Sequence, residues 1–353
     1  DLDRKHFGWC SKMESSFFKQ SSAIAKFITV VMFLVAVAGT TSFAQEIPDE
    51  YRGQESLIAR GILDGNLIET NFRNHGELAR WNDLPWGVWP RGIGGRHIDG
   101  IGIMVSARVP AERAKWPFYN GRPDTLVNPV ILTYRDAGKR LGPDGSLWGW
   151  LPINGFHNET RFNSRGQLEP TPALSDDPTS WPSFWPDRLD NPDDPGWSNQ
   201  WNGFFGRGVF NADLEGFYVI DDFSDLEHSV DPETGQPLSR WGVFYPSASD
   251  STKGGMGLRT KVRLFQWANI LAEDAMFIIY RITNTSETNY RFNAAGDEGM
   301  FFGQIMDYGL GNEEGDENAA FDAQQDITYG WDQDGIGQRQ DGTLYDLGYT
   351  GFA

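Results

Sequence analysis

Residues 258–264 read Leu-Arg-Thr-Lys-Val-Arg-Leu, and this stretch decides the fold class. Uncharged and charged side chains alternate at every position, which is the period of a β-strand whose side chains point to opposite faces. The alternation predicts a strand that buries its four uncharged side chains and exposes Arg259, Lys261 and Arg263 to solvent. One buried and one solvated face are typical of an antiparallel sheet.

Other short apolar stretches, each bounded by turn-forming residues, lie on both sides of this strand. The clearest of them cover residues 100–107, 126–134, 275–283, 299–306 and 327–331. The stretch 275–283 is β-branched and aromatic, so we expect it at the centre of a sheet. After residue 68 no stretch of convincing length has the period of an amphipathic helix. The sequence therefore predicts an all-β fold, an antiparallel β-sandwich that is Ig-like or larger and rich in loops, with a barrel or a β-propeller-like arrangement as alternatives.

The composition excludes several classes of function. The chain has 353 residues, with 49 acidic against 30 basic side chains and a formal net charge of −19. This charge argues against nucleic acid as a partner, because binding phosphates requires clustered Lys and Arg. The single cysteine, Cys10, excludes an internal disulfide and a CxxC metal site. An acidic surface adapted to salty surroundings explains the charge as well as cation binding does.

Residues 13–44 have the three parts of a secretory signal peptide. Lysines precede an apolar run at residues 27–38, and small residues stand before the cleavage site that we expect between Ala44 and Gln45. A membrane anchor is the alternative, but Lys26 ends the run short of the roughly 20 apolar residues that a span needs. We therefore expect a mature protein that is secreted or held at the cell surface, with no span of its own.

The remaining chain divides by composition. Met13 is the expected start, so residues 1–12 would be upstream, non-native sequence. After the leader we expect a loop-rich β region at residues 45–175 and a β-sandwich-like region at residues 176–353 that looks truncated at its C-terminus. The proline-dense stretch at residues 170–200 is either an interdomain linker or an ordered loop pinned by its tryptophans.

Several motifs resemble those of large secreted proteins of the Bacteroidetes type. They are residues 181–187 (Trp-Pro-Ser-Phe-Trp-Pro-Asp), 201–215, 280–284 (Tyr-Arg-Ile-Thr-Asn) and 322–335. Proteins of this group often carry a C-terminal type IX secretion sorting domain, and the resemblance implies export and a β-rich architecture. No sorting domain is seen in this sequence, which fits the expectation of an N-terminal fragment. The group supplies no catalytic or binding residues that can be carried over.

Four carboxylates are candidate catalytic residues: Asp213, Glu215, Asp221 and Asp222. Two carboxylates that face each other across a cleft can cleave a glycosidic bond. Asp213 and Glu215 would share one face of a strand, with about 7 Å between their Cα atoms. A secreted carbohydrate-active hydrolase is therefore one interpretation, and metal binding or plain solvation of the carboxylates is the other.

A second group of carboxylates indicates calcium. Asp332-Gln-Asp-Gly335 places two carboxylates before a glycine that permits a sharp turn, as loops of oxygen ligands require. The EF-hand pattern is incomplete here, so a solvated acidic turn is the alternative. The candidate ligands of a structural Ca²⁺ are Asp322, Asp326, Asp332, Asp334 and Asp341.

The chain contains 14 tryptophans, several of them followed by proline. Exposed indole rings stack on the apolar faces of sugars, whereas buried ones close the core of a loop-rich fold. The candidate ligand-binding rings are Trp148, Trp150, Trp181 and Trp185. Export, strand content and tryptophan density together favour a non-enzymatic β protein that binds glycan or another surface component, with the hydrolase as the alternative.

Overall fold

The computed structural model describes residues 47, 51–92, 95–109, 130–134, 140–186, 197–231, 233–239, 242–291, 299–311, 315–339 and 341–353. These residues contain no α-helix, and two 3₁₀ turns, η2 (Glu55–Leu57) and η4 (Pro178–Ser180), accompany the strands. The predicted all-β class is confirmed. The upstream residues 1–12, the leader at residues 13–44 and its cleavage site lie outside the described residues.

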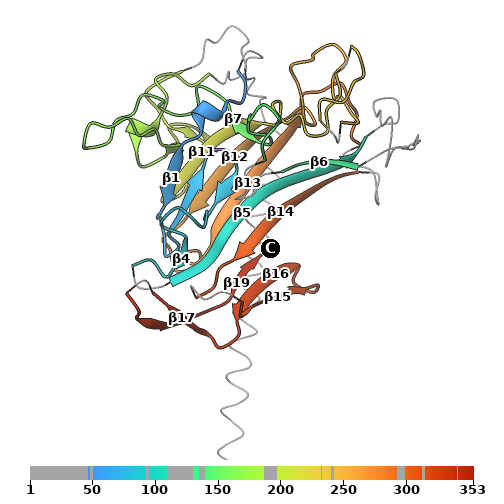
Figure 1. Cartoon of the computed structure of the whole chain (residues 1–353). Coiled ribbons are helices and arrows are strands. Elements are labelled where there is room, and N and C mark those ends of the chain that lie inside the picture. The colour runs from blue at the N-terminus through green and yellow to red at the C-terminus, as the bar shows by residue number, and fades with distance from the viewer. Residues whose placement is uncertain are drawn as a thin grey trace, which may run out of the picture. The chain divides into compact units, whose positions relative to one another are not determined.

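The first sheet has seven antiparallel strands in the order β1-β2-β3-β5-β14, with β4 and β6 also paired to β5 (Figure 1). Its strands are β1 (Arg60–Leu63), β2 (Thr70–Arg73), β3 (Glu77–Leu78), β4 (Gly87–Trp89), β5 (Gly95–Arg108), β6 (Val130–Tyr134) and β14 (Met300–Tyr308). The pairing of β14 with β5 brings residues from the two predicted regions, 45–175 and 176–353, into one sheet.

The second sheet has five antiparallel strands in the order β13-β12-β11-β7, with β8 also paired to β11. Its strands are β7 (Leu151–Pro152), β8 (Ala173–Leu174), β11 (Leu214–Asp221), β12 (Leu258–Gln266) and β13 (Met276–Asn284). The alternating stretch that predicted the fold is β12, and Val262 lies between Tyr218 of β11 and Tyr280 of β13.

The two sheets pack face to face around one hydrophobic core. Ile103 and Val105 of the first sheet and Val262 of the second belong to the same buried cluster. The ring of Phe72 on β2 stacks on that of Tyr218 on β11, with 6.3 Å between centroids. Apolar faces of two sheets buried against each other form a β-sandwich. The predicted sandwich is therefore confirmed.

The outer face of the second sheet differs from the prediction. Arg259 and Arg263 of β12 are buried, although the alternation predicted a solvent face for them. The Arg259 guanidinium donates to the Tyr51 carbonyl at 2.7 Å, and Arg263 forms an ion pair with Glu215. The prediction was wrong because a layer of loops covers this face, and a period of two cannot tell a solvated charge from a buried, paired one.

Strand β13 also differs from the prediction of a central strand. Among the described strands it pairs only with β12, so it lies at an edge of the second sheet. Phe277, Arg281 and Thr283 are exposed along its outer face, while Ile278 and Ile282 pack against the core. The strand therefore packs apolar side chains against the core on one face and exposes side chains to solvent on the other.

Smaller sheets complete the described fold. A hairpin pairs β9 (Asn202–Gly203) with β10 (Gly206–Arg207), and a second pairs β17 (Ile336–Gln338) with β18 (Leu344–Asp346). A three-stranded sheet has the order β15 (Glu317–Asp322), β16 (Ile327–Asp332) and β19 (Thr350–Phe352). No helix among the described residues has the length and apolar character needed to cross a membrane.

Candidate functional site

Four tryptophans from residues 181–201 form the loop layer on the outer face of the second sheet, which we call the tryptophan layer: Trp181, Trp185, Trp197 and Trp201. The Trp185 ring lies 5.7 Å from that of Trp197 and 5.9 Å from that of Trp201, measured between centroids. It also contacts Phe217 of β11 at 6.1 Å. This layer explains why every residue of β11 is buried.

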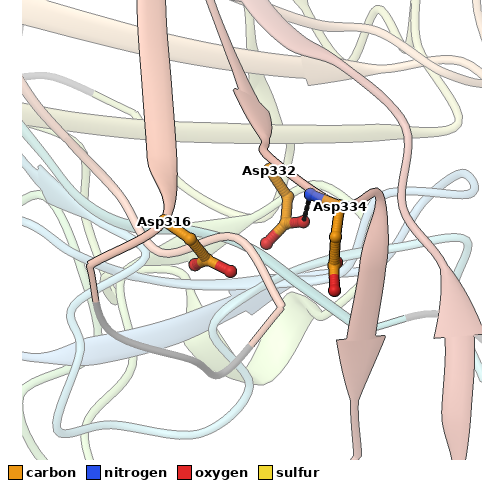
Figure 2. Close-up of side chains that lie close together, drawn as sticks. All are labelled: Asp316, Asp332 and Asp334. Carbon is orange, nitrogen blue, oxygen red and sulfur yellow. Dashed lines mark hydrogen bonds between the residues drawn. The ribbon is translucent and has the colours of Figure 1, made fainter.

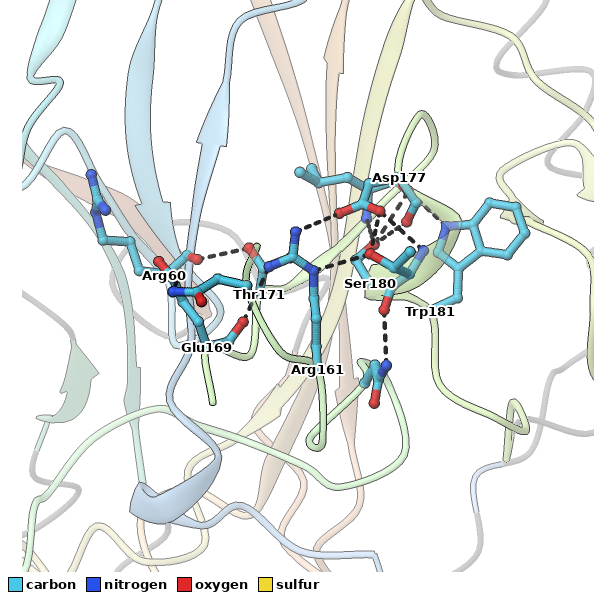
Figure 3. Close-up of polar contacts among 11 residues, drawn as sticks. Arg60, Arg161, Glu169, Thr171, Asp177, Ser180 and Trp181 are labelled. Carbon is cyan, nitrogen blue, oxygen red and sulfur yellow. Dashed lines mark hydrogen bonds and ion pairs between the residues drawn. The ribbon is translucent and has the colours of Figure 1, made fainter. Parts of the chain in front are cut away.

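Polar contacts hold in place the loop segments that precede these tryptophans in the chain, between residues 161 and 180 (Figure 3). The Arg161 guanidinium forms an ion pair with Asp177 at 3.1 Å. The Thr171 hydroxyl donates to the carbonyl of Arg60 at 2.8 Å, which ties the loop to β1 of the first sheet. The described parts of the proline-dense stretch are thus an ordered cover of the sheet rather than a linker.

The four predicted sugar-binding tryptophans do not form an exposed platform. Trp148, Trp150 and Trp185 are buried, and Trp181 is half-buried with its indole N–H donating to the Leu174 carbonyl at 2.6 Å. A ring without an exposed face cannot stack on a sugar from solvent. The burial of Trp148, Trp150 and Trp185 favours the alternative interpretation, in which these rings pack in the interior, and leaves Trp181 as the one ring of the four with partial exposure.

Glu215 is the most heavily engaged of the predicted catalytic carboxylates. It is buried beneath the tryptophan layer, where it accepts hydrogen bonds from the Trp201 indole at 2.9 Å and the Phe204 backbone N–H at 3.1 Å. It also forms an ion pair with Arg263, whose guanidinium lies over the Phe217 ring. These donors occupy both oxygens of a carboxylate that water does not reach.

Asp221 and Asp222 are buried at the end of β11 and accept backbone hydrogen bonds. Asp221 accepts from Gly53 at 2.9 Å, and Asp222 accepts from Met256 at 2.8 Å and Leu258 at 2.7 Å. Burial raises the pKa of Asp221 to about 6 and raises that of Asp222 well above its ordinary value. Both side chains therefore join neighbouring segments of backbone.

Asp213 completes the predicted catalytic set. It is exposed, and its carboxylate accepts a hydrogen bond from the Ala268 backbone N–H at 2.7 Å, which fixes the chain just after β12. Glycoside hydrolysis needs two carboxylates that reach one glycosidic bond from solvent. The burial of Glu215, Asp221 and Asp222 removes three of the four candidates from such a site.

A row of aromatic rings, most of them partly exposed, continues the tryptophan layer toward β13 at the edge of the second sheet. We call it the aromatic row: Phe205, Phe204, Phe265, Trp267 and Phe277. Successive centroids along this row are 4.9, 5.8, 5.6 and 5.3 Å apart. Phe265 is buried and anchors the row, whereas Phe205 is 52% and Phe277 46% exposed.

The sheet fixes the aromatic row from beneath. Phe265 of β12 and Phe277 of β13 are cross-strand partners, and the Phe265 ring stacks on Trp267 with an interplanar angle of 11°. The Trp267 indole N–H donates to the Asn211 carbonyl at 2.8 Å. Sequence reasoning missed this row, although Phe265 follows Arg263 in the period of two and so had to lie on the outer face.

The loop between β12 and β13 extends the exposed apolar surface. Ile270 is 82% exposed at its tip, and Leu271 and Phe210 are exposed as well. This loop directly follows Trp267 in the chain, and exposed apolar side chains that gather together mark a binding site more often than scattered single residues do. The aromatic row and this loop therefore form the strongest candidate ligand surface among the described residues.

The predicted calcium ligands are divided by the structure. Asp332 and Asp334 lie together with Asp316, and one oxygen of each is within 4.8 Å of the others (Figure 2). Burial raises the pKa of Asp332, and the nearby Asp316 and Asp334 act in the same direction. Asp322, Asp326 and Asp341 do not belong to this group.

Asp316 was not predicted as a ligand, because no spacing connects it to the turn at residues 332–335. The antiparallel register of β15 and β16 places Glu317 opposite Asp332 and so brings Asp316 beside them. Compared with models of known protein families, with curated proteins and with solved structures, the chain matches none.

Proposed function

We propose that this protein is a non-catalytic binding module of an exported protein, and that it holds a neutral polysaccharide on the aromatic row. The observation that carries the proposal is a set of partly exposed rings, centred on Trp267 and Phe277, on the outer face of a rigid sheet. The apolar faces of pyranose rings pack on such rings. Little conformational freedom is lost on binding, because strand pairing already fixes the platform.

The charge of the chain selects among polysaccharides. A formal net charge of −19 repels sulfated and uronate-rich chains, so the favoured ligand is uncharged. Asp213 adds negative charge beside the row, where it accepts a hydrogen bond at 2.7 Å from the backbone N–H of Ala268, the residue after Trp267. Carboxylates at such a position accept hydrogen bonds from sugar hydroxyls.

Two further observations favour binding over hydrolysis and over a role inside the cell. Glu215, Asp221 and Asp222 are buried and hydrogen-bonded within the fold, which argues against the hydrolase. The sequence of residues 13–44 has the pattern of a signal peptide, which favours export. An exported binding module would meet polysaccharides outside the cell.

The direct test is a screen of the purified protein against arrays of neutral and anionic glycans, with reducing-sugar release measured on the same polysaccharides. We expect retention on at least one neutral glycan and no release of reducing sugar. Retention on anionic glycans alone, capture by protein partners without any glycan binding, or release of reducing sugar would each contradict the proposal.

A further inference from the structure

Three aspartates from two segments of the chain converge at one end of the β15–β16 hairpin (Figure 2). Asp316 directly precedes β15, Asp332 ends β16, and Asp334 lies in the turn before β17. One carboxylate oxygen from each lies within 4.8 Å of the other two. The Asp332 side chain is held in place, because its Oδ1 accepts from the backbone N–H of Asp334 at 3.0 Å and of Gly335 at 2.7 Å.

Two other oxygens of this cluster, one on Asp332 and one on Asp316, have no donor among the described residues, whereas Oδ1 of Asp334 accepts from the Ile336 backbone N–H at 2.8 Å. Asp332 is only 4% exposed, and its Oδ2 is buried without a hydrogen-bond partner among the described residues. Oδ1 of Asp316 is buried and unpartnered in the same way. A buried carboxylate oxygen without a donor is costly, and native proteins satisfy such atoms with a partner, a water or an ion.

Among the described residues, no cationic side chain forms an ion pair with this cluster. None of the ion pairs among the described residues involves Asp316, Asp332 or Asp334. From residue 293 to residue 353 the sequence has one basic residue, Arg339, and its guanidinium lies over the Tyr345 ring at 5.1 Å. A cation from solution would therefore compensate the charge that the described residues leave unpaired.

We propose that Asp316, Asp332 and Asp334 bind a calcium ion, at a site separate from the aromatic row. Calcium takes oxygen ligands at about 2.3–2.6 Å, so two ligands on opposite sides of the ion lie roughly 4.6–5.2 Å apart. One oxygen of each aspartate lies within 4.8 Å of the other two, so all three can reach a single ion of this size. Calcium accepts an irregular set of carboxylate, carbonyl and water oxygens, whereas magnesium requires near-ideal octahedral geometry. Water and backbone carbonyls complete the coordination.

The ion would act as a cross-link between segments. It joins the start of β15, the end of β16 and the turn before β17, which are held together otherwise by hairpin pairing and local backbone hydrogen bonds. The chain has one cysteine and so no internal disulfide. A bound cation that favours the folded state supplies the equivalent stabilisation by mass action.

The test is the melting temperature of the full chain, first in EDTA and then with 1 mM (roughly 100 times a micromolar Kd) of calcium or magnesium chloride. We expect calcium to raise the melting temperature by about 5 °C. Asp332→Asn and Asp316→Asn should lose this rise. The matched control is Asp322→Asn on the same hairpin, a residue that lies outside the cluster and should keep the full rise.

A second readout separates ion binding from a merely structural role. In EDTA, Asp332→Asn and Asp316→Asn should melt at or above the temperature of the unsubstituted protein, because each removes repulsion between neighbouring carboxylates. If Asp332→Asn does not fold, the more exposed Asp316→Asn carries the test. The proposal is overturned if calcium leaves the melting temperature unchanged, if both variants keep the rise, or if magnesium gives an equal rise.

Discussion

Glu215 and Arg263 form a buried ion pair beneath the tryptophan layer, so the Glu215 carboxylate stabilises the fold. Removing one partner of a buried pair leaves the other charge uncompensated, which costs about 3–5 kcal/mol. We therefore predict that Glu215→Gln lowers the free energy of unfolding by about 3 kcal/mol in urea denaturation. The control Asp213→Asn, two residues away and exposed, should cost less than about 1 kcal/mol.

The same substitution would separate a structural carboxylate from a catalytic one. A catalytic Glu215 would leave the stability of the Glu215→Gln variant near that of the unsubstituted protein and abolish a measurable release of sugar. That pair of results would contradict the assignment made here.

Asp221 predicts a dependence of stability on pH. Its pKa is about 6 in the folded protein and near the ordinary 3.8 once unfolding exposes it to water. The folded state therefore binds more protons between these values, so the contribution of Asp221 to stability is fully present below about pH 4 and is lost as the pH rises through about 6. The loss attributable to Asp221 is about 3 kcal/mol.

Urea denaturation at pH 4 and pH 7 measures this loss. The decrease in unfolding free energy between the two values should be smaller in Asp221→Asn, which carries no charge at either pH. An equal decrease in the variant would show that Asp221 is not the group responsible.

Among the elements, the tryptophan layer makes the most specific prediction. Trp185 is buried against Trp197, Trp201 and Phe217, so Trp185→Ala would leave a large cavity over β11. The expected cost is about 3–5 kcal/mol in unfolding free energy. Trp81, which is 55% exposed, provides the control, and Trp81→Ala should stay within about 0.5 kcal/mol. Equal costs would show that the layer does not stabilise the sheet.

Single strands were predictable because their side chains follow a period of two. Residues 258–264 and 327–331 lie within β12 and β16, and residues 299–306 begin one position before β14. The burial of each face of a strand depends on the segments that pack against it. A period of two in the sequence therefore fits a face covered by loops as well as a face exposed to solvent. That is why the burial of Arg263 and the edge position of β13 were not foreseen.

For the whole molecule, the sandwich followed from strand content, whereas the candidate sites depend on strand register. The row from Phe204 to Phe277 joins a hairpin to two strands, and the calcium site needs Asp316 beside Asp332 across β15 and β16. Neither the aromatic row nor the aspartate cluster can be recognised from the spacing of its residues in the sequence. Residue type alone could not tell whether tryptophans such as Trp150 and Trp185 pack in the core or bind a ligand, and the structure buries both.

The central claim is that the outer face of the second sheet binds polysaccharide through the aromatic row. Isothermal titration of the neutral glycan found by the array, into the unsubstituted protein and into Phe277→Ala, tests it most directly. We predict a loss of affinity of about tenfold or more, or at least 1.4 kcal/mol, in Phe277→Ala with an unchanged melting temperature. The control Phe321→Ala, an exposed phenylalanine outside the row, should bind normally. Equal affinity of Phe277→Ala and the unsubstituted protein would contradict the claim.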